Sequence, residues 1–333
     1  MKRTIFLAAL LALLICSGAA GAAFPVTVTD SMGYTVMITQ QPQTIISLAP
    51  ANTEIIYALG AGDKVVGNTD YCNYPEEAKA VAKIGGFSTI SIEKITALKP
   101  DIIFANDNNG LANIEQLKNL GFTVVVVNPT SIDTIYSSIE LVGKCLGEDT
   151  AAQKIVTEMK EKIQAIADKA AQAKTTPSVT HVMSVNPYWV SGSNTFQDEL
   201  IRLAGGKNAF ANIDGWGAVT LEKLVVANPD IILTDPGAEM GDFGNDSLRD
   251  SFFEDTRLAT VNAVKNNQVT VIDADIFDRG GPRAAEALEW LAKVIHPEIF
   301  GEHAASQTSA ASPGFGAGVL LAGLCAALIL KRK

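Results

Sequence analysis

Apolar and polar positions follow two periods along this chain, one typical of strands and one typical of helices. Short continuous apolar runs predict strands that are buried on both faces, and segments with apolar residues three and four positions apart predict helices. The expected strands span 44–48, 64–67, 101–105, 122–127, 178–185, 230–234 and 268–273, after a hairpin at 26–30 and 34–39, and the expected helices span 52–59, 92–98, 111–120, 195–204, 221–227 and 283–295. The alternation predicts an α/β protein with mostly parallel, doubly wound sheets.

One stretch of the pattern occurs twice, at 91–103 and 220–232, with a constant offset of 129 residues. Each copy carries a glutamate followed by a lysine, so that Glu93 and Glu222 are equivalent, and the match extends upstream to align Phe87 with Trp216. A repeated unit of this kind predicts two similar lobes. Ligands commonly bind between such lobes, so residues repeated in both are candidates to face a shared partner.

A long helical segment separates the two copies. Residues 150–174 lack strand signals, and Ile155, Met159, Ile163 and Ile166 recur at helical spacing. We therefore expect an N-terminal lobe at 24–148, a rigid connecting helix at 149–175 and a C-terminal lobe at 176–300.

The two ends of the chain carry targeting patterns. Residues 1–22 combine a basic start, an apolar run and small residues, which predicts a cleaved secretory signal. Lipidation at Cys16 is an alternative that the bulky Ile15 before it disfavours. At the other end we expect a Ser/Ala/Thr-rich stalk at 301–312 and a membrane segment at 313–333 that ends in three basic residues.

The net charge and the cysteine content limit the classes of partner and of covalent cross-link that the chain can have. The formal net charge of −10 argues against nucleic acid as a partner. Outside the terminal segments the cysteines are Cys72 and Cys145, and the sequence leaves open whether they form a disulfide. Asn245 begins a weak glycosylation sequon.

Enzymatic motifs are not apparent in the sequence. The 3 histidines have no metal-ligand spacing, and His181 is expected to be a packed strand residue. The chain has no Gly-x-Ser-x-Gly turn and no phosphate-binding glycine-rich loop. The sequence therefore predicts neither catalysis nor a metal or cofactor.

Polar loops follow the expected strands at 106–110, 128–130, 186–189, 235–237 and 275–279. Ligands bind at such strand ends in open α/β sheets, although turn chemistry alone accounts for any one loop. Several aromatic side chains stand in or beside these loops without a periodicity that would bury them, namely Phe87, Tyr188, Trp189, Trp216 and Phe277. As a set they favour a flat, largely apolar ligand.

Glu93 and Glu222 have two interpretations. A glutamate near the start of a helix stabilises the helix dipole, and Ser91 or Thr220 before it is a plausible cap. The same residue at equivalent places in both lobes also suits two anchor points on one external partner.

The ordered motifs at 48–54, 57–60, 66–75, 203–206 and 281–283, together with the repeat, resemble the substrate-binding proteins of ABC importers for cobalamin, haem and ferric siderophores. The resemblance covers about 26–299 and implies two lobes joined by a stiff helix, with little closure on binding. The order of Pro-Gly-Phe, apolar run and basic tail at 313–333 resembles the sorting segment of archaeal surface proteins.

The family resemblance also implies roles for individual residues. Glu93 and Glu222 would dock onto arginines of a permease dimer. The aromatic wall of the cobalamin binders matches Tyr71, Phe87, Trp189 and Trp216, with Tyr188 beside them, and their Asp-x-Phe-acid-Arg loop matches Asp275, Phe277 and Arg279. Asn106 stands where the cobalamin pattern has a further tryptophan, and the histidine cluster of the zinc and manganese relatives is missing.

These observations predict an exported, monomeric binding protein, tethered to the outer face of the cytoplasmic membrane, that delivers a cobamide to an ABC permease dimer with its ATPase subunits. A ferric siderophore or haem is the alternative ligand, and a surface adhesin or an enzyme on the same fold is a remote alternative. An anionic siderophore would need cationic partners, for which Arg279 and Arg283 are the candidates. A pair between Arg283 and Glu286, one turn along the helix, is an equally open explanation of Arg283.

Overall fold

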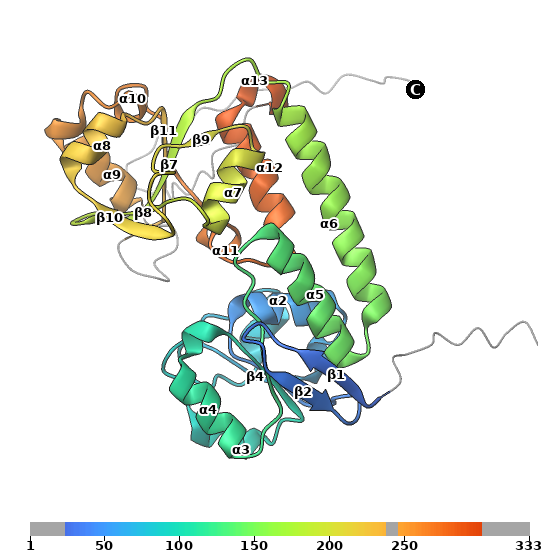
Figure 1. Ribbon diagram of the computed structural model, residues 1–333. Helices are drawn as coiled ribbons and strands as arrows, with labels where there is room; N and C mark the ends of the chain where they lie inside the picture. The colour runs from blue at the N-terminus through green and yellow to red at the C-terminus, as the bar shows by residue number, and fades with distance from the viewer. Residues whose placement is uncertain (1–23, 238–245, 302–333) are drawn as a thin grey trace, which may run out of the picture. The chain divides into compact units, whose positions relative to one another are not determined.

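The computed structural model describes residues 24–237 and 246–301, and it contains two larger β-sheets with helices packed around them, besides the two-stranded sheet of β1 and β2 (Figure 1). The first sheet has the strand order β4-β3-β5-β6, and all of its strands are parallel. The second has the order β10-β8-β7-β11-β12, with β9 paired to β7. The predicted α/β class with mostly parallel sheets is confirmed, while the exact limits of the lobes stay predictions.

The N-terminal part opens with a small antiparallel hairpin and continues through the first sheet to two long helices. Its elements are β1 (Val26–Thr29), β2 (Thr35–Ile38), β3 (Ile45–Ser47), α2 (Pro50–Ala58), β4 (Val65–Asn68), α3 (Ile92–Leu98), β5 (Ile102–Ala105), α4 (Leu111–Asn119), β6 (Val124–Val126), α5 (Ile132–Leu146) and α6 (Asp149–Ala170), with short 3-10 turns at Gly62–Lys64, Glu76–Ala80 and Asp107–Asn109.

The C-terminal part holds the second sheet. Its elements are β7 (Ser178–Ser184), β8 (Tyr188–Ser191), α7 (Phe196–Leu203), β9 (Lys207–Asn208), β10 (Trp216–Val219), α8 (Leu221–Ala227), β11 (Ile231–Thr234), α9 (Ser247–Glu254), α10 (Asn262–Lys265), β12 (Val269–Val271), α11 (Ala274–Phe277), α12 (Ala284–Ile295) and α13 (Pro297–Phe300), with a 3-10 turn at Thr256–Leu258.

The duplicated segment folds in the same way in both places. Ser91 caps α3 by accepting a hydrogen bond from the Lys94 backbone, and Thr220 caps α8 in the same way from Lys223. Both helices end on a left-handed residue, Lys99 at φ 48° and Asn228 at φ 44°. The repeat is therefore a structural unit with matched caps.

The aspartate of each copy joins its strand to the neighbouring one. The Asp101 carboxylate accepts hydrogen bonds from the Gln43 and Thr44 backbone, just before β3, at 2.8 and 2.9 Å. Asp230 accepts one from the Ser178 backbone, at the start of β7, at 2.9 Å. These bonds fix the register between adjacent parallel strands in both sheets.

Two long helices connect the sheets (Figure 1). Helix α6 lies within the predicted connecting segment 149–175 and ends at Ala170, and it buries Met159, Ile163 and Ile166 on one face. Helix α5, which packs against α6, was not expected from the sequence, although Ser131 and Thr134 form a capping box at its start.

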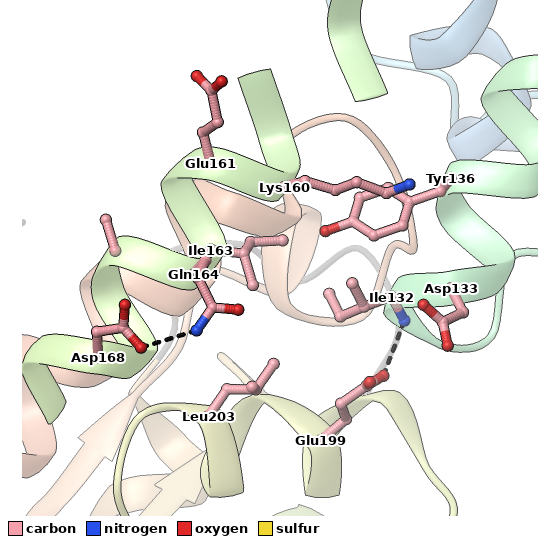
Figure 2. A pocket seen from close by; sticks show the side chains of 11 residues that line it. Ile132, Asp133, Tyr136, Lys160, Glu161, Ile163, Gln164, Asp168, Glu199 and Leu203 are labelled. Carbon is pink, nitrogen blue, oxygen red and sulfur yellow. Dashed lines mark hydrogen bonds between the residues drawn. The ribbon is translucent and has the colours of Figure 1, made fainter. Parts of the chain in front are cut away.

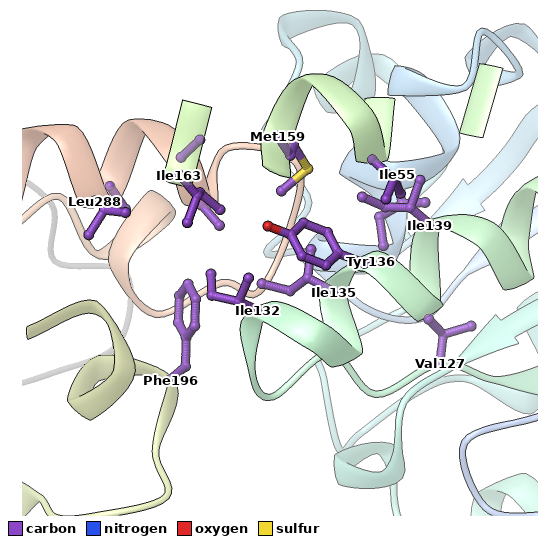
Figure 3. Close-up of a cluster of buried hydrophobic side chains, with 14 of the residues drawn as sticks. Ile55, Val127, Ile132, Ile135, Tyr136, Ile139, Met159, Ile163, Phe196 and Leu288 are labelled. Carbon is purple, nitrogen blue, oxygen red and sulfur yellow. The ribbon is translucent and has the colours of Figure 1, made fainter. Parts of the chain in front are cut away.

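One continuous hydrophobic cluster runs through both lobes. It includes Ile55 of α2, Tyr136 of α5, Met159 of α6, Phe196 of α7 and Leu288 of α12, which converge in Figure 3. Separate clusters fill the opposite faces of the second and first sheets. Because a large apolar junction resists hinge motion, the shared cluster favours a stiff connection between the lobes.

Cys72 and Cys145 are both buried free thiols, so they do not form a disulfide with each other. The predicted signal at 1–22, the segment at 313–333 and the sequon residue Asn245 lie outside the described residues, as does the stalk at 301–312 apart from Gly301. None of the helices within 24–237 and 246–301 is long and apolar enough to cross a membrane.

Candidate functional site

The segments that follow the strands of the two sheets meet at a junction that contains ion pairs between side chains. Arg283, just before α12, donates to the Glu54 carboxylate of α2 from Nε at 2.9 Å and from Nη2 at 2.7 Å. Glu54 retains only 3% of its side-chain exposure, and this burial raises its pKa, although Arg283 acts in the opposite direction. The junction therefore contains a desolvated ion pair between the lobes.

Arg279 adds a second set of contacts across the same junction. Its guanidinium donates to Asn73 Oδ1 at 2.6 Å and to the Tyr71 carbonyl at 3.3 Å, and it pairs with Asp275. Asn73 in turn donates to Asp275 Oδ2 at 2.7 Å. The predicted ligand residues Tyr71, Asp275 and Arg279 are thus brought together, and Arg279 is already neutralised by protein groups.

Two of the predicted aromatic residues, Tyr71 and Phe87, belong to the N-terminal side. Tyr71 is 37% exposed, and its ring lies beside Gly86, next to half-buried Phe87. The Phe87 carbonyl accepts a hydrogen bond from Asn109 Nδ2 at 2.7 Å, which fixes the backbone of that turn. The partly exposed Tyr71 ring and half-buried Phe87 are therefore the aromatic residues that the N-terminal side offers.

Trp189 and Trp216 lie on the C-terminal side, on paired antiparallel strands. In the register of β8 and β10, Ser191 opposes Trp216 and Ala218 opposes Trp189. Directly opposed residues share a face, so the two tryptophans are diagonal neighbours on one face of the pair. Trp189 is 38% exposed and Trp216 is half-buried, which leaves both rings partly available.

Tyr188 and Phe277 occupy different positions from those expected. Tyr188 packs against Phe252 in the hydrophobic cluster of the second sheet, and Phe277 is almost completely buried. The argument that loop aromatics have no means of burial is wrong for these two, because 188–191 forms a strand and 274–277 a helical turn.

The amide of Asn106 is occupied by the protein itself. It donates to the Val127 carbonyl and to Asn128 Oδ1, both at 3.1 Å, and the residue is 6% exposed. Its Oδ1 also accepts from the Asn108 backbone at the start of a 3-10 turn. These bonds explain its position without a ligand, so its ligand role stays a prediction.

Sequence reasoning missed a cluster in which buried His181 meets Asp235 and Asp278. His181 Nε2 lies 2.9 Å from Asp235 Oδ1, and Gln197 Nε2 donates to Asp278 Oδ1 at 2.9 Å. Burial lowers the pKa of His181 and the Asp235 contact outweighs it, so the pKa is raised overall. Burial raises the pKa of Asp278 to about 7. The available signal was two aspartates in separate strand-end loops, with a histidine inside a strand of the same sheet.

Two hollows lie elsewhere on the protein. One, of about 690 Å³, lies between α5, α6 and α7, where Tyr136, Lys160 and Glu199 line it (Figure 2). The other, of about 450 Å³, lies beside α8 and includes Glu222. None of the predicted ligand-lining residues borders either hollow, so neither coincides with the predicted ligand site.

Glu93 and Glu222 are both exposed, each in the first turn of its helix. A hydrogen bond from its own backbone and one from Thr220 lower the pKa of Glu222, so its carboxylate is ionised in neutral solution. These hydrogen bonds explain Glu222 locally, and its exposure leaves the carboxylate accessible to an external partner.

Known proteins resemble this chain over most of its length. The family model described as Periplasmic binding protein matches residues 45–276. The uncharacterised ABC transporter substrate-binding lipoprotein YvrC of Bacillus subtilis (strain 168) is 38% identical over 286 residues, covering 84% of this chain and 88% of that protein.

Two further relatives carry ligands in their names. The vitamin B12-binding protein of Vibrio cholerae serotype O1 (strain ATCC 39541 / Classical Ogawa 395 / O395) is 30% identical over 251 residues, covering 74% of this chain and 87% of that protein. The periplasmic heme-binding protein RhuT of Roseiflexus sp. RS-1, in apo form, has a similar structure with a TM-score of 0.70 and 26% identity, covering 77% of this chain and 99% of that one. This chain therefore belongs to the periplasmic binding protein family and is a substrate-binding protein of the ABC transporter type, not an enzyme.

Proposed function

We propose that this protein captures a cobamide outside the cell and delivers it to the permease of an ABC importer. The observation that carries the proposal is that aromatic rings at the junction are exposed, while the arginines there are neutralised by carboxylates. Tyr71 and Trp189 remain more than a third exposed, whereas both arginines near them are paired with acids. A corrin ring offers flat apolar faces edged by neutral amides, and exposed rings suit those faces.

Haem and ferric siderophores would require a binding site with a different distribution of charge. The propionates of haem and the acidic groups of many siderophores call for uncompensated cations. The sequence offers Arg279 and Arg283 as cations for a siderophore, but Arg279 pairs with Asp275 and Arg283 pairs with Glu54. These pairs favour the cobamide, and the similarity to a heme-binding protein keeps haem as the competing ligand.

Titration of the purified full chain tests this choice. Quenching of tryptophan fluorescence by cyanocobalamin, haemin and a panel of ferric siderophores should reveal one submicromolar ligand, and we expect it to be the cobamide. A submicromolar affinity for haemin or a siderophore, with none for cyanocobalamin, would overturn the assignment.

Matched tyrosine variants locate the binding surface. Tyr71→Ala should weaken cobamide binding about tenfold, because loss of a stacked ring costs about 1–1.5 kcal/mol. Tyr34→Ala removes a ring of the same 37% exposure from the β1–β2 connection and should leave affinity unchanged. Equal effects of both variants would mean that Tyr71 does not contact the ligand.

Delivery to the permease is the second half of the proposal. The exposed carboxylates of Glu93 and Glu222 stand on matched helices of a duplicated unit, which supports docking to two equivalent subunits. Export would follow from the cleaved signal at 1–22, and tethering at the outer face of the membrane would follow from the segment 313–333. Mass spectrometry of the mature protein distinguishes simple cleavage after the signal from a lipid on Cys16 and reports whether the C-terminal segment is retained.

A further inference from the structure

Three side chains able to bind a metal ion converge in the second sheet from separate parts of the chain. His181 lies in β7, Asp235 follows β11, and Asp278 follows α11. One potential ligand atom from each lies within 4.8 Å of the other two. Ligand atoms that each lie about 2.0–2.2 Å from one ion are at most about 4.4 Å apart, so a small shift of these side chains would bring the cluster to the spacing found around a single bound cation.

The topology of the sheet explains why these residues meet. β7 and β11 are parallel, and His181 stands opposite Leu233. Side chains alternate along a strand, so Leu233 and Asp235 share the face that carries His181. The next strand, β12, leads directly into α11 and so brings Asp278 to the same end of the sheet.

The surroundings hold the three groups in place. Gln197 of α7 donates to Asp278 Oδ1 at 2.9 Å and to the Phe277 carbonyl at 3.2 Å. The rings of Trp216 and Phe277 meet the His181 ring edge-on, with centroids 5.6 and 5.4 Å away. Oriented ligands inside an apolar shell are typical of protein metal sites.

Neither aspartate of the cluster pairs with a lysine or arginine in the part of the chain that the structure describes. Within residues 24–237 and 246–301, His181 is the only basic side chain that forms an ion pair with Asp235, and none does so with Asp278. Arg279, the next residue after Asp278, is turned to Asp275 and the N-terminal lobe instead. Asp235 keeps 15% of its side-chain exposure, so an ion can reach the cluster from solvent.

We propose that His181, Asp235 and Asp278 bind a first-row divalent metal ion such as Zn²⁺ or Mn²⁺. One imidazole nitrogen and two carboxylate oxygens form the mixed ligand set that such ions prefer, and three protein ligands leave room for water or a donor atom of another molecule. The ion would link Asp278 to His181 and Asp235 of the second sheet. It would thereby fix the position of the segment that contains Asp275 and Arg279. This inference does not depend on the identity of the transported ligand.

Calorimetry on the untagged, chelator-treated full chain tests the proposal with Zn²⁺, Mn²⁺ and Mg²⁺ as probes. We expect one equivalent of Zn²⁺ or Mn²⁺ to bind at micromolar or lower concentration, and Mg²⁺ to bind at least tenfold more weakly. His181→Ala and Asp278→Asn should each weaken binding at least tenfold. Absence of binding at 1 mM of either ion, or affinity that both variants leave unchanged, would overturn the proposal.

Two controls keep the result interpretable. Glu298→Gln changes a carboxylate beside the other buried histidine, His296, from which it lies 3.0 Å, and should not alter metal affinity. If the cluster variants fail to fold, the visible absorption of the wild-type chain loaded with Co²⁺ replaces them. Bands typical of nitrogen and oxygen coordination by the protein would support the site, and the spectrum of hydrated Co²⁺ would refute it.

Discussion

The Arg283 guanidinium joins the two lobes by donating two hydrogen bonds to the Glu54 carboxylate, at 2.9 and 2.7 Å. Its Cζ also lies 3.9 Å from the centre of the Tyr74 ring, so the cation is enclosed by N-terminal residues. The alternative pair with Glu286 is therefore wrong. The positive charge of Arg283, at the start of α12, therefore stabilises the contact between the lobes.

Removing Glu54 should be costly because the Arg283 charge would remain buried without its partner. We expect Glu54→Gln to lower the free energy of unfolding by about 3 kcal/mol. Urea denaturation of the full chain measures the change. Arg283→Met on that background should restore part of the loss, and a double variant less stable than Glu54→Gln alone would show that the pair is not the cause.

The duplicated unit could be predicted almost completely from the sequence, and the junction could not. Caps, apolar periods and the turn after each repeat helix are local signals, so α3 and α8 follow directly from residues a few positions apart. Arg283 and Glu54 are 229 residues apart, and only the packing of the lobes brings them together. The meeting of His181 with Asp278 likewise depends on the order of strands in the sheet.

For the aromatic residues, too, the sequence alone does not predict which side chains are buried. Trp189 and Tyr188 are adjacent, and the sequence pattern predicts that both lie in a loop. The structure places them in a strand, where alternation buries Tyr188 and leaves Trp189 at 38% exposure. A short antiparallel strand with apolar residues on both faces gives no clear period by which to choose between them.

The docking proposal predicts a separation between binding and transport. Glu93→Ala and Glu222→Ala should each reduce cobamide uptake about tenfold, equivalent to about 1.4 kcal/mol, because a permease cation loses its partner. Ligand affinity should stay the same, since both carboxylates point to solvent. Uptake by cells and titration of the purified chain measure the two quantities.

A matched acidic residue provides the control for docking. Asp133 is exposed in the first turn of α5, so Asp133→Ala removes the same charge from the same place in a helix. Uptake should be unaffected by this change. Weaker ligand binding in the glutamate variants would instead assign Glu93 and Glu222 to the ligand site.

The pH dependence of stability should show the contribution of Glu289. Hydrogen bonds from Lys293 and from Lys162 of α6 lower the pKa of Glu289 to about 2 from its ordinary 4.5. Because the folded state binds this proton less tightly than the unfolded state, the stabilisation is present above pH 4.5 and is lost as the pH falls toward 2.

Glu289→Gln should therefore destabilise the protein near pH 7 and have little effect near pH 2. The side chain is 38% exposed, so the expected loss at pH 7 is only about 0.5–1 kcal/mol. Urea unfolding of wild type and variant across this range measures it. A difference that does not change with pH would mean that the carboxylate charge is not responsible.

Two neighbouring glycines allow a test of the junction that leaves every charge in place. A Cβ atom added to Gly280 would lie 2.2 Å from the Pro129 carbonyl oxygen, which is backbone of the N-terminal lobe and cannot move aside easily. A Cβ atom on Gly281 would make only an ordinary contact, 3.5 Å from Glu54 Oε2. Gly280→Ala should push the segment of Asp275 and Arg279 away from the N-terminal lobe.

We expect Gly280→Ala to lower the free energy of unfolding by about 1–3 kcal/mol, as overpacking does. It should also weaken cobamide binding, because Arg279 would lose its contacts with Asn73 and Tyr71. Gly281→Ala should change both quantities much less. Calorimetric melting and ligand titration of the two variants decide the matter, and equal behaviour would mean that the close approach at Gly280 does not control how the lobes meet.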